Sequence, residues 1–192
     1  FPYTTLFRLI GDFDPSIFPI PSLLEEEIIK AYQEKKTNYP PASGISELRN
    51  EVAAFIKRKM LLDYDPSTIL ISGGGRPLIY AAYRTICDEG EKIIYPVPSW
   101  NNNHYTHFVN GKHICIETSV DNNFLPTAEE LIPHFKEATL LALCSPLNPT
   151  GTLFSKEQLT KICAAVIEEN KSRTSQQKPL YILFDQIYWT LT

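Results

Sequence analysis

The sequence predicts an α/β protein built on a largely parallel β-sheet with helices on both faces. Short apolar runs have the length of strands and are mostly bounded by Pro, Gly or Asp; they lie at residues 68–72, 92–95, 113–117, 140–144 and 180–184. Helical patterns separate them, at residues 77–87, 101–110, 127–135 and 155–169. Parallel strands require a crossover between them, so this alternation predicts five strands in one sheet.

Capping patterns mark the starts of two helices. Ser155 and Gln158 have the spacing of a capping box. The apolar residues that follow fall on one face of the predicted helix: Leu159, Ile162, Cys163, Val166 and Ile167. Ser22 and Glu25 form a second predicted capping box, which starts a helix that ends near residue 36. The apolar spacing predicts one more helix over residues 46–61.

Composition and charge exclude two classes of protein. Apolar residues make up 43% of the 192 positions, which is enough for a hydrophobic core. Charged residues interrupt every apolar stretch before it reaches the roughly 18 residues that a membrane-spanning helix needs. The 18 Lys and Arg residues are outnumbered by 22 Asp and Glu residues, so the basic surface that nucleic acid requires is missing. We therefore expect neither a membrane nor a nucleic acid as a partner.

Cysteine and histidine spacing argues against a metal site. The four cysteines, at positions 87, 115, 144 and 163, are too far apart for a C-x-x-C motif. We expect them to be reduced, buried core residues of a cytoplasmic protein. His104 and His107 lie one helical turn apart and are either metal ligands or ordinary surface histidines. No acidic or cysteine ligand accompanies them at a suitable spacing, so we expect no metal.

The residues that follow each strand are the place to look for chemistry, because ligands bind outside the carboxyl ends of such sheets. After the first run comes a glycine-rich turn, residues 73–75, and then Arg76 and a helix. Glycines allow a close backbone approach, and a helix N-terminus attracts phosphate. The turn matches neither G-x-G-x-x-G nor G-x-x-x-x-G-K-[ST], and alone it is equally explained as a flexible connection.

The other predicted strands are followed by an aromatic, an amide and a carboxylate residue. Trp100 offers a flat face to a ring or caps the edge of the core. Asn148 lies among turn-forming residues, where its amide can bind a ligand or simply belong to the turn. Asp185, with Tyr188 three positions later, is a ligand group or a helix N-cap. Together these groups suit one ligand that carries a phosphate, an aromatic ring, a polar ring substituent and a ring nitrogen.

With these motifs in this order, the sequence resembles the aminotransferase class I/II family of fold-type I enzymes, which use pyridoxal 5'-phosphate (PLP). The resemblance covers nearly the whole chain. It rests on Gly11-Asp12, residues 39–44 followed by Glu47-Leu48-Arg49, the glycine turn, Pro98-Ser99-Trp100, Asn148-Pro149-Thr150-Gly151, and Asp185 with Tyr188. It implies the large domain of a fold-type I PLP-dependent transferase, truncated before its last strands.

For the phosphate and the ring face, the resemblance implies that Gly74, Gly75 and Arg76 surround the cofactor phosphate, chiefly through backbone N–H groups. Many relatives carry a small or hydroxylated residue where Arg76 stands, so the resemblance implies backbone contacts and no conserved charged one at this position. Trp100 resembles the aromatic residue that stacks on the pyridine ring.

For the polar atoms of the ring, Asn148 and Tyr188 resemble the pair that binds the phenolic oxygen. Asp185 resembles the carboxylate that faces the pyridine nitrogen, where it would keep the nitrogen protonated and the ring able to accept electrons. Asp185 and Tyr188 are thus the expected catalytic residues within this chain.

Further positions follow from the resemblance alone. Tyr39 resembles a tyrosine that reaches the cofactor phosphate of the partner subunit in family dimers, and Gly11 resembles a glycine near the substrate carboxylate. Cis peptide bonds are expected before Pro98 and Pro149, although only about 5–6% of X-Pro bonds are cis. We also expect residues 1–36 to belong to a small domain and residues 37–192 to a partial PLP-binding large domain.

One essential residue of the family is missing. The family's Schiff-base lysine follows the strand of Asp185 by tens of residues, whereas the last lysine here is Lys178. We expect the chain to be an inactive part of a PLP-dependent aminotransferase, which transfers an amino group from an amino acid to a 2-oxo acid as a homodimer. A different PLP enzyme, such as a C–S lyase or decarboxylase, and a non-catalytic remnant are the alternatives.

Overall fold

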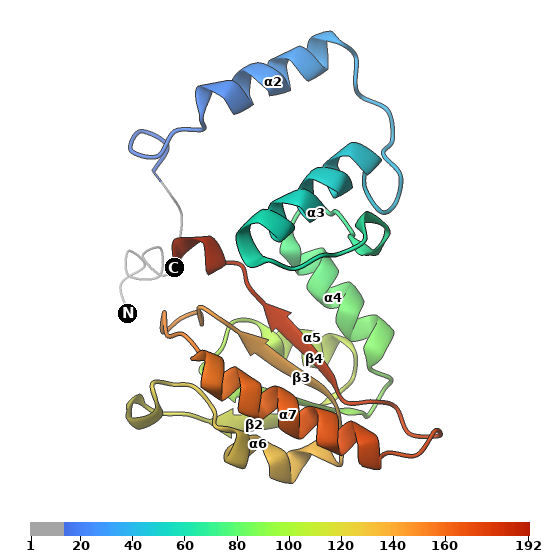
Figure 1. The fold of residues 1–192 in the computed structure, drawn as a ribbon, viewed down its shortest axis with the longest axis vertical. Helices are drawn as coiled ribbons and strands as arrows, with labels where there is room; N and C mark the ends of the chain where they lie inside the picture. The colour runs from blue at the N-terminus through green and yellow to red at the C-terminus, as the bar shows by residue number, and fades with distance from the viewer. Residues whose placement is uncertain (1–13) are drawn as a thin grey trace. The chain divides into compact units, whose positions relative to one another are not determined.

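The computed structural model describes residues 14–192. The chain divides into two compact units, residues 1–69 and residues 70–192, and Figure 1 shows the course of the chain through them. We describe each unit by itself. None of the helices in the described residues combines the length and hydropathy that crossing a bilayer requires.

The first unit is helical and contains α2 (Ser22–Gln33), α3 (Ser46–Met60) and the short 3-10 helix η2 (Pro66–Thr68). Both predicted α-helices are present, but the predicted capping box at the start of α2 is wrong. Pro21 holds the N-cap position with φ −54° and ψ 133°, and no side chain caps the helix. Because Ser22 is already the first helical residue, its hydroxyl is not placed to cap the next turn.

The predicted first strand, residues 68–72, is also wrong. Its first residue ends η2, and Ile69 is extended, with φ −93° and ψ 128°. No strand in residues 14–192 pairs with this segment. An apolar extended segment becomes a β-strand only when a neighbour accepts and donates its backbone hydrogen bonds, and this segment lacks one.

The second unit contains the parallel sheet that the sequence predicts. Its strands are β1 (Lys92–Val97), β2 (Lys112–Glu117), β3 (Ala138–Cys144) and β4 (Tyr181–Asp185), in the order β2-β1-β3-β4, and all three pairings are parallel. Four of the predicted strands are therefore confirmed. Every residue of β3 is buried, as expected for a central strand, whereas β4 is only partly buried at one edge of the sheet.

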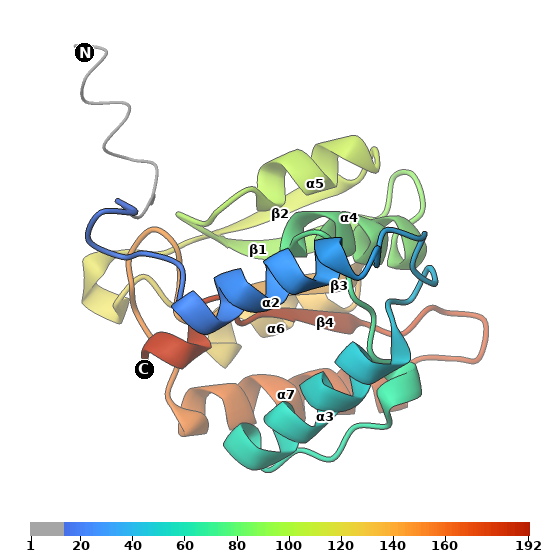
Figure 2. The ribbon, with the colours of Figure 1, turned by 90° about the horizontal axis from the view of Figure 1, so that it is seen from above.

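Helices cover both faces of this sheet, as predicted (Figures 1 and 2). The helices are α4 (Gly75–Ile86), α5 (Asn102–Phe108), α6 (Ala128–Phe135) and α7 (Lys156–Ser172). Successive side chains along each strand point to opposite faces of the sheet, which divides the core into two parts. Ile94 and Leu141 pack with residues of α6 and α7, whereas Ile93 and Leu140 pack with residues of α4 and α5.

The start of α7 agrees with the sequence in detail. Ser155 Oγ accepts from Gln158 N at 3.1 Å, and Gln158 Oε1 accepts from Ser155 N at 2.8 Å, which completes the predicted capping box. The apolar face is wider than the buried one, because Ile162 and Val166 are buried while Ile167 is exposed.

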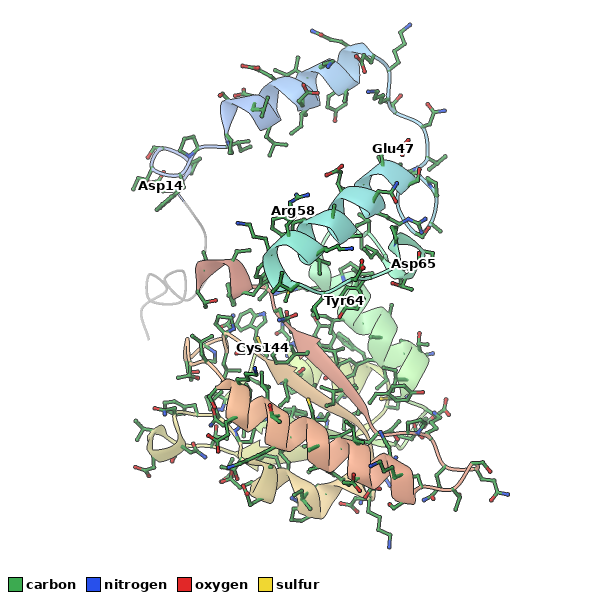
Figure 3. The ribbon with its side chains drawn as sticks, viewed as in Figure 1. Asp14, Glu47, Arg58, Tyr64, Asp65 and Cys144 are labelled. Carbon is green, nitrogen blue, oxygen red and sulfur yellow. The ribbon has the colours of Figure 1, made fainter. Side chains whose placement is uncertain are left out.

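The cysteine prediction is half correct. All four thiols are free, and Cys87 and Cys144 are buried, the latter at the end of β3 (Figure 3). Cys115 and Cys163 are exposed. Cys115 lies on the edge strand β2, and Cys163 lies on the side of α7 that the sheet does not cover, so neither position receives packing from a second layer.

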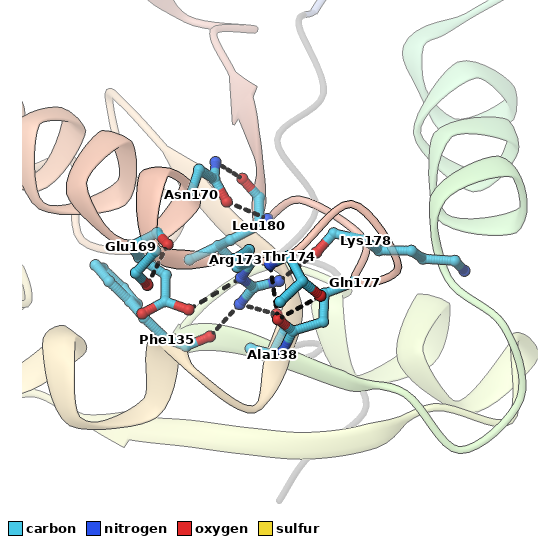
Figure 4. A network of polar contacts seen from close by, with 10 residues as sticks. Phe135, Ala138, Glu169, Asn170, Arg173, Thr174, Gln177, Lys178 and Leu180 are labelled. Carbon is cyan, nitrogen blue, oxygen red and sulfur yellow. Dashed lines mark hydrogen bonds and ion pairs between the residues drawn. The ribbon is translucent and has the colours of Figure 1, made fainter.

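An arginine network holds together the amino ends of β3 and β4 (Figure 4). The Arg173 side chain is 8% exposed and pairs through Nε with Glu169 Oε1 at 2.9 Å. Its terminal nitrogens donate to the carbonyl oxygens of Phe135, Ala138 and Lys178. One side chain thus joins the ends of α6 and α7 to the start of β3 and to the loop before β4, at the end of the sheet opposite the carboxyl ends of the strands.

Candidate cofactor site

The carboxyl ends of β3 and β4 lie side by side and carry part of the candidate site. Cys144 and Asp185 are register partners at these ends. The backbone pairing continues one step further, because Ser145 N donates to the Asp185 carbonyl at 3.0 Å. The loop that carries Asn148 therefore leaves the sheet directly beside Asp185.

The glycine turn forms an open helix N-terminus. Gly74 has φ 155°, which L-residues with a side chain rarely adopt, and α4 begins at Gly75 with no side-chain cap. A Cβ atom added at Gly73, Gly74 or Gly75 would meet nothing within 4 Å. First-turn N–H groups have no acceptor within a helix. The turn thus offers donors and open space that suit an anion.

The loop after β1 places Trp100 beside the start of α4. Trp100 is 51% exposed. The Asn101 amide faces two donors, so we assign its oxygen to that side. In this orientation Oδ1 accepts from Trp100 Nε1 at 2.8 Å and from Arg76 Nη2 at 3.3 Å. The predicted ring-stacking residue and the predicted phosphate residue are therefore joined through Asn101, which the sequence analysis did not single out.

The amide of Asn148 meets the hydroxyl of Tyr188. Asn148 Nδ2 donates to Tyr188 Oη at 3.3 Å, and both side chains are partly buried. The peptide bonds before Pro98 and Pro149 are cis, as expected, and the bond before Pro146 is cis as well. An amide and a phenol in contact provide two adjacent groups that can bind one oxygen atom of a ligand.

Asp185 has one oxygen fixed by the backbone, because its Oδ1 accepts from Ile187 N at 3.1 Å. Its charge influences Tyr105 on α5. Burial raises the pKa of Tyr105, the positive charge of Arg76 lowers it, and the negative charge of Asp185 raises it. Arg76 and Asp185, which come from opposite ends of this unit's sequence, are therefore both within electrostatic range of Tyr105.

The same carboxylate acts on Cys144. Burial raises the pKa of this thiol to about 11; a hydrogen bond from the Asn148 backbone lowers it, and Asp185 raises it. The buried thiol donates to the carbonyl of Pro146 at 3.1 Å. Cys144 is therefore a neutral, hydrogen-bonded residue beside Asp185.

The structure brings most of the predicted site residues into two groups within the second unit. Arg76 and Trp100 are joined through Asn101. Asn148 and Tyr188 meet where β3 and β4 end, beside Asp185. Nothing in the sequence marked Asn101 or Tyr105, because an asparagine after a tryptophan and a tyrosine on an amphipathic helix are common.

Two predicted positions fall outside this arrangement. Tyr39 belongs to the first unit, where its side chain is fully exposed. Gly11 lies outside the described residues. In the described part of the chain, no group of three or more His, Cys, Asp or Glu side chains could hold a metal ion.

The donor set fits PLP. The open glycine turn suits a phosphate, the half-exposed indole of Trp100 suits an aromatic ring, and the amide–phenol pair suits a phenolic oxygen. The partly buried carboxylate of Asp185 suits a protonated ring nitrogen. Three of these groups follow the carboxyl ends of β1, β3 and β4, where ligands of open α/β sheets bind, and the glycine turn lies at the N-terminus of α4.

Comparison with known proteins gives a consistent result. Residues 11–191 match the family model described as aminotransferase class I and II. The aspartate aminotransferase of Bacillus subtilis is 28% identical over 185 residues, which are 95% of this chain and 44% of the relative. That of Pinus pinaster is 32% identical over 174 residues, 89% of this chain and 34% of the relative.

Solved structures agree with these sequence matches. A mutant of the aspartate aminotransferase from Thermus thermophilus superposes with a TM-score of 0.82 at 27% identity, over 93% of this chain and 47% of the other. The chain thus spans less than half the length of the relatives it matches. The chain belongs to the aminotransferase class I and II family, whose members are PLP-dependent enzymes of fold type I.

Proposed function

We propose that these residues form the cofactor cradle of a PLP-dependent aminotransferase that moves an amino group from an amino acid to a 2-oxo acid. The observation that carries the proposal is the Asn148–Tyr188 hydrogen bond, which lies where β3 and β4 end at Cys144 and Asp185. It supports one site in which an amide, a phenol and a carboxylate bind the polar atoms of a single PLP ring.

Each residue has a separate task in this proposal. Bound PLP supplies an aromatic ring that takes up the electrons released when a bond to the substrate Cα breaks. Asp185 keeps the ring nitrogen protonated by placing a negative charge beside it. Asn148 and Tyr188 orient the phenolic oxygen, the N–H groups of Gly75 and Arg76 hold the phosphate, and the Trp100 indole covers one face of the ring and excludes water.

The catalytic unit in this proposal is a longer protein. Coverage of 44% of the Bacillus subtilis enzyme supports this, and the family resemblance implies a Schiff-base lysine beyond Tyr188. Residues 1–36 are proposed to contribute to a small domain and residues 37–192 to the large domain. We also propose a homodimer in which Tyr39 approaches the partner's cofactor phosphate, and Gly11 as a residue near the substrate carboxylate.

The test uses the full-length protein, expressed from the complete reading frame that contains these residues. It is incubated with PLP, L-aspartate and 2-oxoglutarate, because two of the relatives above are aspartate aminotransferases. We expect glutamate and oxaloacetate in equal amounts, and a panel of other amino acids then defines the preferred donor. Within that panel, pyruvate, ammonia and hydrogen sulfide from cysteine would instead indicate C–S elimination, and carbon dioxide with the matching amine would indicate decarboxylation; either result without amino transfer would overturn the proposed reaction.

A further inference from the structure

We propose that Asn101 is a positioning residue that holds the ring-stacking Trp100 and the phosphate-end Arg76 in one fixed arrangement. The inference rests on the proposed function, since it assigns Trp100 and Arg76 to the same ligand. Asn101 itself is proposed to act through these two neighbours and not on the ligand directly. We call the three side chains the Trp100–Asn101–Arg76 bridge.

The bridge consists of one acceptor and two donors. Oδ1 of Asn101 accepts from the indole Nε1 of Trp100 at 2.8 Å and from Nη2 of Arg76 at 3.3 Å. An indole has a single polar atom, so this hydrogen bond fixes the rotation of the ring. Arg76 is the second residue of α4, so the bridge couples the indole to the helix whose N-terminus is proposed to bind phosphate.

The backbone at position 101 explains why an asparagine suits this task. Asn101 has φ 63° and ψ −1°, a left-handed conformation, and it precedes the first residue of α5. Asparagine tolerates this conformation better than most residues with a side chain, and glycine tolerates it best. Glycine would preserve the backbone but remove the acceptor, so the choice of asparagine has a side-chain reason.

A second set of hydrogen bonds, from buried side chains, fixes the same loop. Tyr83 Oη donates to Asn102 Oδ1 at 2.9 Å, and Asn102 Nδ2 donates to Ser99 Oγ at 3.2 Å. Tyr83 is fully buried and Asn102 is 9% exposed. Because Tyr83 and Arg76 both belong to α4, this helix holds the loop at Asn101 and Asn102, directly after Trp100. The ring-covering indole and the phosphate-binding turn are therefore parts of one rigid assembly.

Pre-organisation of this kind raises affinity, because the two groups need not be ordered when the ligand binds. Loss of the Asn101 acceptor should free the indole to rotate and release Arg76 from its place beside the turn. A typical hydrogen bond contributes about 0.5–1.5 kcal/mol, which corresponds to a change of about twofold to tenfold in affinity.

The first experiment observes the bridge without a ligand. Full-length protein labelled only at tryptophan is examined by proton–nitrogen NMR, and Trp100→Phe identifies the Trp100 indole signal. We expect Asn101→Gly to shift this signal and to speed its exchange with solvent, whereas Asn101→Asp, which keeps an acceptor oxygen, retains slow exchange. An indole signal unchanged in Asn101→Gly would overturn the proposal.

The second experiment measures affinity for pyridoxamine 5'-phosphate, which binds without a Schiff base, by calorimetry on the cofactor-free full-length protein. We expect Asn101→Gly to weaken binding about threefold to tenfold. The matched control is Asn110→Gly, because Asn110 also has a positive φ, 55°, and lies beyond the other end of α5. The control should change affinity by less than about twofold.

A mutant cycle separates positioning from a general structural effect. If Asn101 acts only through its two neighbours, Asn101→Gly should change affinity by less than about twofold when Trp100 and Arg76 are both already alanine. An undiminished effect in that background would overturn the positioning role. Wild-type protein that fails to bind pyridoxamine 5'-phosphate would refute the proposed function itself, whereas tight wild-type binding with an unaffected Asn101→Gly variant would refute only this inference.

Discussion

Asn148 donates a hydrogen bond to the hydroxyl of Tyr188 at 3.3 Å, although 40 positions separate the two residues in the sequence. They meet because β3 and β4 are adjacent parallel strands, and each residue follows the carboxyl end of its strand. The crossover helix α7 occupies the intervening sequence on one face of the sheet. Parallel topology thus turns two distant motifs into a single pair of ligand-binding groups.

Replacing Asp185 by Asn should reduce turnover far more than cofactor binding. The amide has nearly the same shape but no charge, so it cannot favour a protonated ring nitrogen. In the full-length protein we expect kcat to fall on the order of 100-fold or more, with a change of less than about tenfold in PLP affinity. Steady-state kinetics and a PLP titration check this; equal losses in the two quantities would count against the role of Asp185.

The Asn148–Tyr188 pair should show coupled effects on ligand binding. We expect Asn148→Ala and Tyr188→Phe each to weaken binding of pyridoxamine 5'-phosphate. The double variant should lose less binding free energy than the sum of the losses in the two single variants. The coupling free energy should be about 0.5–1.5 kcal/mol, the range of a hydrogen bond between contacting groups. Strict additivity in calorimetric titrations would mean that the two groups do not bind the same ligand atom.

Arg173 should be among the strongest stabilising residues of the second unit. Its substitution by Met leaves Glu169 without its partner and three backbone carbonyls without their donor, where the Arg173 and Glu169 side chains are only 8% and 17% exposed. We expect a loss of about 3–5 kcal/mol in the free energy of unfolding, measured with urea. The matched control is Lys171→Met.

That control removes a solvent-exposed ion pair on the same helix, whereas the Arg173–Glu169 pair is buried. Lys171 and Glu168 are 66% and 70% exposed, so water already screens their attraction. Its loss should cost less than about 1 kcal/mol. Equal destabilisation by both variants would show that the Arg173 network contributes no more than a surface pair.

The four cysteines should separate into two classes on alkylation. Burial raises the pKa of Cys87 to about 12 and that of Cys144 to about 11, so near neutral pH both remain protonated and unreactive. Cys115 and Cys163 are exposed and should react first with iodoacetamide. Peptide mass spectrometry after partial labelling checks this, and labelling in denaturant, where all four should react, is the control.

The same pKa shifts predict a pH dependence of stability. A thiol that binds its proton more tightly when folded stabilises the folded state fully below its unfolded pKa of about 8.5. This contribution is lost as the pH rises through about 11 for Cys144 and about 12 for Cys87. Cys144→Ala should therefore flatten the alkaline part of the stability profile; an unchanged profile would contradict the assignment.

The sequence was sufficient for the features that depend on local pattern. Apolar runs bounded by turn residues located four strands, and the Ser155–Gln158 spacing located the start of α7, because such signals lie within a few positions of each other. Residues after the strand ends also indicated three of the candidate groups, since parallel topology brings the carboxyl ends of neighbouring strands together whatever lies between them.

The incorrect predictions depend on partners that local pattern does not reveal. Residues 68–72 have a strand-like composition, but pairing makes a strand, and no strand of the described chain pairs with them. Ser22 has a capping residue's chemistry, yet Pro21 takes the N-cap position. Cys115 is apolar in pattern and lies on an edge strand, so its exposure follows from strand order. Asn101 was missed because only the folded chain brings it to Arg76, and Tyr105 because only the folded chain brings it within range of the charges of Arg76 and Asp185.

A crystal structure of the full-length protein with pyridoxamine 5'-phosphate tests the central claim most directly. The account predicts one ligand per copy, with its phosphate at the glycine turn, its ring against Trp100 and its ring nitrogen facing Asp185. A ligand bound elsewhere, or a structure in which Asp185 and Trp100 face separate regions, would contradict it.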